Sequence, residues 1–131
     1  MSKFLDKLGR EWHLEINIAA MRRAKSKGID LSMVIKQLAE FIMDDVFLCD
    51  ALWAIVKPGA DEQGVTQEQF EAGLDGTNLE LAREALWKAL EAYYALGKSQ
   101  MLSAAIASVK AEMAKATADL ISIGSTESKA N

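Results

Sequence analysis

The chain has 131 residues and a formal net charge of −4, and half of its residues are apolar while 26% are charged. This composition is typical of a soluble globular protein and excludes an intrinsically disordered one. Lys and Arg are spread along the chain and no apolar run reaches the length of a membrane span, so we expect neither nucleic acid nor a membrane as a partner. The single cysteine, Cys49, cannot form an intramolecular disulfide, which agrees with a cytoplasmic protein.

An N-terminal β-hairpin is predicted over residues 3–18. Apolar and polar residues alternate strictly from Trp12 to Ile18, which is the pattern of a half-buried strand. A lone strand cannot satisfy its own hydrogen bonds, and residues 3–6, followed by a turn at 7–10, supply an antiparallel partner.

The next segments predict three helices in succession. Asn17 can cap a short basic helix that stops at Gly28, and Asp30 can cap a second helix that continues to Ile42. The pair Asp44 and Asp45 stands at the N-terminus of a third, apolar helix, where free amides favour carboxylates. We expect this third helix to end near Pro58–Gly59, because proline breaks the helical hydrogen-bond ladder. Cys49 lies in this apolar helix, which favours a buried, inert thiol.

The segment KPGADEQGVTQEQF at 57–70 has the acidic and glycine residues of a calcium-binding loop. Its register does not fit: with Gly64 at position 6, Phe70 takes the position of the bidentate Glu, and Asp61 alone stands well as a ligand. A helix start explains more of the residues, because Thr66 and Gln69 have the spacing of a capping box. We therefore interpret the segment as the beginning of a helix.

The chain shows no pattern of residues that would support catalysis or bind a metal. His13 is the only histidine, and it stands on the polar side of the predicted strand without a nucleophile or orienting carboxylate in its segment. Glu40, Asp44 and Asp45 are close in sequence, but no histidine is near them and capping explains the two aspartates. The common nucleotide-binding and catalytic signatures are also missing. We expect a protein that is not an enzyme and has no catalytic residue, metal or cofactor.

The C-terminal third predicts two further helices. Thr77 to Glu80 has the S/T-x-x-E pattern of a capping box and opens a helix that Gly97 ends. Ser99 then starts a long alanine-rich helix, and residues 124–131 form a small polar tail that we expect to be disordered. We predict a mostly α (α+β) fold in which the hairpin precedes a compact bundle of five to six helices with a long C-terminal helix, all within one domain at 1–123.

The last helix carries apolar residues at alternating spacings of four and three, which is a heptad-like seam of Leu102, Ile106, Val109, Met113, Ala116 and Leu120. Such a seam packs either on the core of its own domain or on a partner helix. In the second case the protein binds an apolar partner or forms a homo-oligomer. The candidate partner-binding residues are Met101, Leu102, Ile106, Val109 and Met113.

Five segments in order resemble a family of small tailed-phage and prophage proteins, the tail assembly chaperones. The segments are GREWHLEINI at 9–18, RRAKSKGIDL at 22–31, DDVFLCDALWAIVKP at 44–58, ADEQGVTQEQFEAGLDG at 60–76 and ALWKALEAYY at 85–94. The resemblance covers residues 4 to about 96. It implies a protein of the host cell cytoplasm that binds the apolar, helical tape measure protein, or another tail protein, and keeps it soluble during tail assembly. An alternative is a small structural or connector protein of the virion that self-associates through its C-terminal helix.

Overall fold

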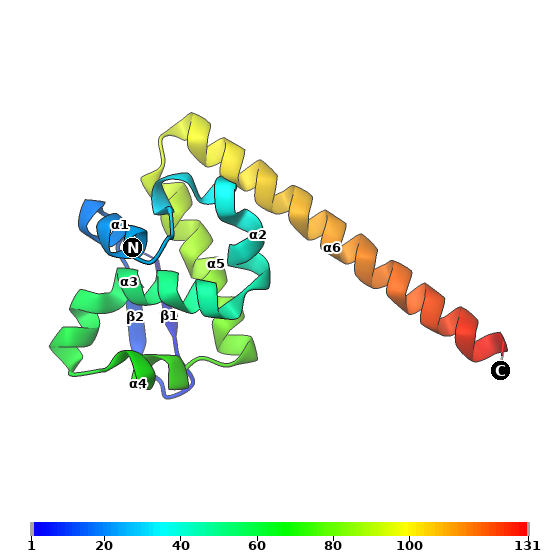
Figure 1. Ribbon diagram of the computed structural model, residues 1–131, viewed down its shortest axis with the longest axis horizontal. Coiled ribbons are helices and arrows are strands. Elements are labelled where there is room, and N and C mark those ends of the chain that lie inside the picture. Colours follow the sequence, from blue (N-terminus) through cyan, green and yellow to red (C-terminus); the bar gives the residue numbers. More distant parts are fainter. Residues whose placement is uncertain (1, 131) are drawn as a thin grey trace.

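Helices make up 75% of the structure, and a two-stranded hairpin precedes them, as Figure 1 shows. The computed structural model describes the backbone of residues 2–130 and the side chains of residues 2–121. The elements in chain order are β1 (Ser2–Leu5), β2 (Glu11–Leu14), α1 (Ile18–Lys25), the 3₁₀ helix η1 (Leu31–Gln37), α2 (Leu38–Met43), α3 (Asp45–Gln63), α4 (Gln67–Ala72), α5 (Gly76–Tyr93) and α6 (Leu96–Ala130). The predicted fold class is confirmed. The tail at 124–131 lies beyond the residues whose side chains are described.

The hairpin is present but shorter than the sequence pattern indicated. β1 and β2 pair antiparallel with Phe4 opposite Trp12, and both of these side chains are buried. β2 ends at Leu14 because the Asn17 side chain accepts a hydrogen bond from the Ala20 amide at 2.8 Å and starts α1 there. The alternation up to residue 18 therefore extends over the end of a strand and the entry to a helix.

The predicted break of α3 at Pro58 is wrong, since the helix continues to Gln63 and ends at Gly64 in the left-handed conformation. Pro58 has no amide hydrogen to donate to the carbonyl of Ala54, one helical turn earlier. Arg23 of α1 fills that gap, because its Nε–H donates to the Ala54 oxygen at 2.6 Å. α1 packs along α3, so a side chain from a neighbouring helix replaces the missing backbone donor.

The predicted single helix between residues 30 and 42 is divided into η1 and α2. Asp30 caps it as expected, accepting from the amide of Ser32, but Met33 has non-helical backbone angles. The Tyr94 hydroxyl donates to the Leu31 carbonyl at 2.6 Å and accepts from the Val34 amide at 3.3 Å. These bonds to the end of α5 take backbone groups that an α-helix would pair internally.

The helix start at Thr66 is confirmed, because Thr66 and Gln69 form a reciprocal capping box at the N-terminus of α4. The predicted start of α5 is displaced: its N-cap residue is Asp75, and Thr77 lies within the first turn. In that turn the Asn78 side chain donates to the carbonyl of the last residue of β1, at 3.2 Å. The first turn of α5, which begins before the predicted cap residue, therefore contacts the hairpin.

The core lies between the hairpin and the helices, and the start of α6 contributes Leu102 and Ile106 to it. Trp12 meets Phe70 edge to face, with ring centroids 5.0 Å apart, and so joins the hairpin to α4. Figure 1 shows α6 crossing the top of this body and then extending away from it. The largest fully buried core side chains include Trp12, Phe41, Phe70, Leu48, Leu52, Leu86, Leu90 and Leu102.

Candidate partner-binding surface on helix α6

The first turns of α6 are anchored in the domain core. Leu102 is fully buried and Ile106 is 6% exposed, while Val109 is half-buried against the same cluster. On the surface, the Lys110 ammonium contacts the Glu84 carboxylate of α5 at 2.9 Å. The domain therefore holds the seam of α6 up to about residue 110.

Beyond this anchor the same seam faces solvent. Every residue from 110 to 121 is exposed, including Met113 at 43%, Leu120 at 70% and Ile121 at 65%. We call the continuation of the seam, from the half-buried Val109 to the exposed Met113, Ala116 and Leu120, the distal stripe. Its spacing of four, three and four residues places these side chains on one face of the helix.

The structure separates the five residues that the sequence grouped as one partner-binding surface. Leu102 and Ile106 are core residues, so a partner cannot reach them while α6 stays docked. Met101 is 56% exposed but lies about a quarter turn around the helix from the seam. Val109 and Met113 belong to the distal stripe. A substitution at Ile106 would therefore test the domain core and not a docking surface.

Two hollows adjoin the distal stripe. One, of about 150 Å³, opens between α6, α5 and α2, and its apolar lining is Ile42, Trp87, Ile106 and Met113. The other lies along α6 itself and is lined by Ser108, Val109, Glu112, Met113 and Ala116. Met113 lines both hollows, so the distal stripe extends from the projecting part of α6 to the hollow between α6 and the domain.

The charged groups at the edge of the first hollow form ion pairs with one another. The Arg83 guanidinium is buried and pairs with Glu80 and, at 3.2 Å, with Asp45. It also donates to the carbonyl of Phe41 at 3.1 Å, near the end of α2. Arg83 therefore holds α5 to the junction of α2 and α3, and Asp45 is one of its ion-pair partners.

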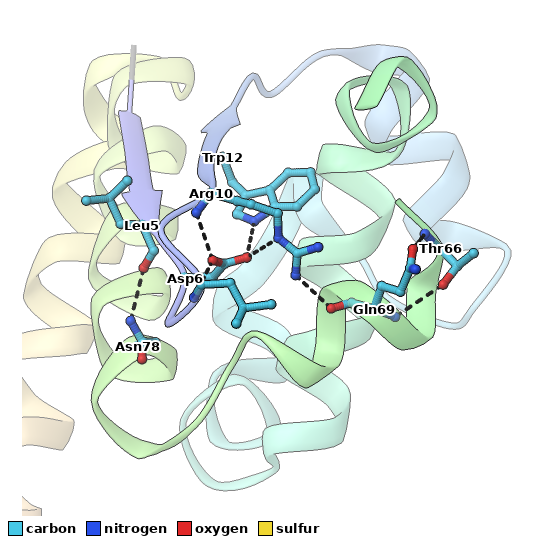
Figure 2. Close-up of polar contacts among 8 residues, drawn as sticks. Leu5, Asp6, Arg10, Trp12, Thr66, Gln69 and Asn78 are labelled. Atoms are coloured by element: carbon cyan, nitrogen blue, oxygen red, sulfur yellow. Dashed lines mark hydrogen bonds and ion pairs between the residues drawn. The ribbon is translucent and has the colours of Figure 1, made fainter. Parts of the chain in front are cut away.

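A second polar cluster lies at the hairpin turn, as Figure 2 shows. One carboxylate oxygen of Asp6 accepts from the amides of Leu8 and Arg10, both at 2.9 Å. The other accepts from Arg10 Nε at 2.7 Å and from Trp12 Nε1 at 3.0 Å. Arg10 also donates to the Gln69 carbonyl at 2.8 Å, which ties the turn to α4.

The acidity of Asp6 follows from these contacts. Burial alone would raise the pKa of this carboxyl, but the hydrogen bonds from Trp12, Arg10 and the backbone outweigh it and lower the pKa below its ordinary value. Because both oxygens already accept two hydrogen bonds, the carboxylate has no free position for a ligand. We interpret the cluster as a structural lock, which accounts for the Gly-Arg-x-Trp sequence at 9–12.

The remaining candidate residues do not converge on a chemical site. His13 is exposed on the outer side of β2. Burial, followed by the neighbouring carboxylates, raises the pKa of Cys49 to about 11, so the thiol stays protonated at neutral pH. Among residues with described placement, no three His, Cys, Asp or Glu side chains gather as a metal would require. None of the described helices is both long and apolar enough to cross a bilayer.

The distal stripe is the surface that best fits a function, because it exposes apolar side chains on a helix that projects from the domain (Figure 1). Its residues come from one continuous helix, and the domain fixes the direction in which that helix leaves. No protein-family model, curated protein or solved structure matches this chain.

Proposed function

We propose that the protein is a tail assembly chaperone of a phage or prophage, which binds the tape measure protein and keeps it soluble in the host cytoplasm. The observation that supports this function is the distal stripe, an apolar helical face that the domain leaves uncovered. A chaperone for long apolar helices needs a surface of this kind, on which a client helix can lay its own apolar face.

The energetics of the projecting helix favour a bound partner. Helices gain most of their stability from packing an apolar face, and each apolar Å² removed from water contributes about 25 cal/mol. Met113 and Leu120 contribute to this face but stay in water in the free protein. Methionine adapts to differently shaped partners, which suits binding to a long apolar helical client.

The distribution of charge supports the same function. Residues 1–95 contain 16 acidic and 11 basic side chains, whereas the segment from residue 96 onward is nearly neutral. A negatively charged body attached to a neutral apolar arm would repel other copies after the arm has bound its client. Net charge of this kind keeps complexes soluble.

Co-expression with candidate tail proteins, followed by affinity capture, tests the proposal. We expect the chain to retain a tape-measure-like protein that is insoluble when expressed alone. Met113→Asp combined with Leu120→Asp should abolish the capture, because both charges fall on the distal stripe. Leu5→Asp with Ile18→Asp is the matched control, since both residues are also exposed but lie on β1 and α1. Equal capture by the double variant and the control would contradict the proposal.

A second candidate is a structural or connector protein of the virion that self-associates through α6. The heptad spacing of the distal stripe favours it, because two such helices can form a coiled coil. This function predicts that the protein remains in purified particles and forms a stable oligomer without any client. The chaperone is expected to be absent from particles.

A further inference from the structure

We infer that the distal stripe binds an amphipathic helix whose apolar seam is bordered by Lys or Arg seven residues apart, and not a second copy of this chain. The inference rests on the proposed function, because it specifies the kind of client helix that the stripe would accept. The charges beside the stripe and the position of the domain support it.

One border of the distal stripe is acidic. Glu112 and Asp119 are seven residues apart, so they occupy the same heptad position beside the seam. Both are exposed, and neither forms an ion pair with any residue whose side chain is described. Lys115 is the nearest free cation, but it lies roughly 130° around the helix from the centre of the stripe. A helix on the stripe therefore meets two unpaired carboxylates on this side.

The other border belongs to the domain, and both cations that line the hollow there, Arg83 and Lys110, are engaged in ion pairs. Lys110 stands there, but its ammonium is held by Glu84. Arg83 is buried and engaged by Glu80 and Asp45. On α6 itself the unpaired charges that flank the stripe are thus Glu112 and Asp119. Charges at such flanking positions determine which helices pair.

A second copy of the chain does not satisfy this arrangement. In an antiparallel pair of α6 helices, the row of Glu112 and Asp119 would face the same row of the other copy, and like charges at these positions are unfavourable. In a parallel pair the domains collide, because Leu102 and Ile106 on the same seam are already covered by the helix's own domain. A different chain with basic flanks avoids both conflicts.

The stripe also has a defined end. From Val109 to Leu120 the helix rises about 16 Å, which is about three turns. At the domain end of this length, the hollow of about 150 Å³ opens beside Met113 and Trp87. A partner helix on the stripe can place one large apolar side chain there, next to the domain.

Two synthetic helical peptides test the inference. Both are about four heptads long with Leu at the a and d positions; one has Lys and the other Glu at the e and g positions. Fluorescence anisotropy of labelled peptide with the full-length protein gives the two Kd values. We expect the Lys peptide to bind about tenfold more tightly at low salt, and the difference to shrink at high salt as the flanking charges are screened.

Charge reversal identifies the responsible residues. Glu112→Lys with Asp119→Lys should reverse the preference between the peptides. Glu62→Lys with Glu68→Lys changes the net charge equally, but at the end of α3 and on α4, on the far side of the domain from α6 (Figure 1). This control pair should keep the preference for the Lys peptide. Circular dichroism of both double variants verifies that the helical content is unchanged.

Several results would overturn the inference. These are equal affinity for the two peptides, no binding of either, an unchanged preference after reversal at Glu112 and Asp119, or a dimer in sedimentation equilibrium that Met113→Asp dissociates. The peptide measurements can succeed even if the proposed function is wrong. If the Lys peptide binds by these rules but no tape-measure-like protein is captured, the proposed function fails while the preference for basic flanks stands.

Discussion

Replacing Asp6 with asparagine should destabilise the protein far more than a single hydrogen bond would suggest. The buried carboxylate accepts four hydrogen bonds, and the substitution exchanges one of its oxygens for an NH₂ group. The new side-chain amide would then turn a donor toward the donors Arg10 Nε–H and Trp12 Nε1–H, or, if flipped, toward the two backbone amides. In either orientation, two donors lose their acceptor.

The expected cost is about 3 kcal/mol of unfolding free energy. An unsatisfied buried N–H such as that of Trp12 costs about 1–2 kcal/mol. Loss of the ion pair adds about 1–2 kcal/mol, which is below the range for fully buried pairs because the Arg10 side chain is 22% exposed. For a domain of this size the sum corresponds to a fall in Tm of about 10 °C.

Urea unfolding of both proteins as a function of pH measures the effect. The pKa of Asp6 is lowered in the folded state, so its stabilising contribution is complete above the ordinary aspartate value of about 4 and is lost as the pH falls through the lowered folded value. The difference between wild type and Asp6→Asn should be constant above about pH 5 and should shrink below about pH 4.

A neighbouring surface pair provides the control. Glu11→Gln removes the exposed ion pair with Lys3, whose charged atoms are 2.8 Å apart, and should cost less than about 0.5 kcal/mol. The structural role of Asp6 is contradicted if Asp6→Asn lowers the unfolding free energy no more than Glu11→Gln does. It is also contradicted if the loss stays the same down to the lowest pH at which the protein folds.

Two further substitutions test backbone arguments. Arg23→Met should cost about 1–2 kcal/mol of unfolding free energy, because it leaves the Ala54 carbonyl without a donor. This cost should fall when Pro58→Ala restores a backbone N–H. Additive costs of the two substitutions in a double-mutant cycle, measured by urea unfolding, would contradict this explanation. Gly73→Ala would bring a Cβ within 2.7 Å of the buried carboxylate oxygen of the hairpin network and should destabilise by about 2 kcal/mol. Gly59→Ala, in open space within α3, should stabilise the protein by about 0.5–1 kcal/mol. If Gly73→Ala and Gly59→Ala shift the urea midpoint in the same direction, the close contact at Gly73 does not explain the effect.

Local signals predicted the parts of the fold that depend on residues close in sequence. The caps at Asn17, Asp44 and Thr66 are where the sequence places them, because a cap needs only a side chain and an amide two or three residues later. The hairpin was also foreseeable from alternation and a turn, although its second strand ends earlier because the cap at Asn17 competes with the strand pattern.

The errors occur where a distant residue changes a local rule. The proline rule ends α3 at Pro58, but Arg23 comes from another helix to bind the carbonyl that the proline leaves free. Likewise, Tyr94 reaches back across about sixty residues of sequence to hold η1 apart from α2. No periodicity within these segments reports such partners.

The candidate site shows the same division. The continuous apolar seam of the last helix follows from the order of its residues alone, because heptad spacing places those residues on one face whatever surrounds them. Which part of the seam is buried depends on the packing of the other helices: the domain covers Leu102 and Ile106, and Met113 and Leu120 are exposed to solvent. A periodic pattern specifies which side of a helix is apolar. The length over which that side is buried depends on how far the rest of the domain extends along the helix.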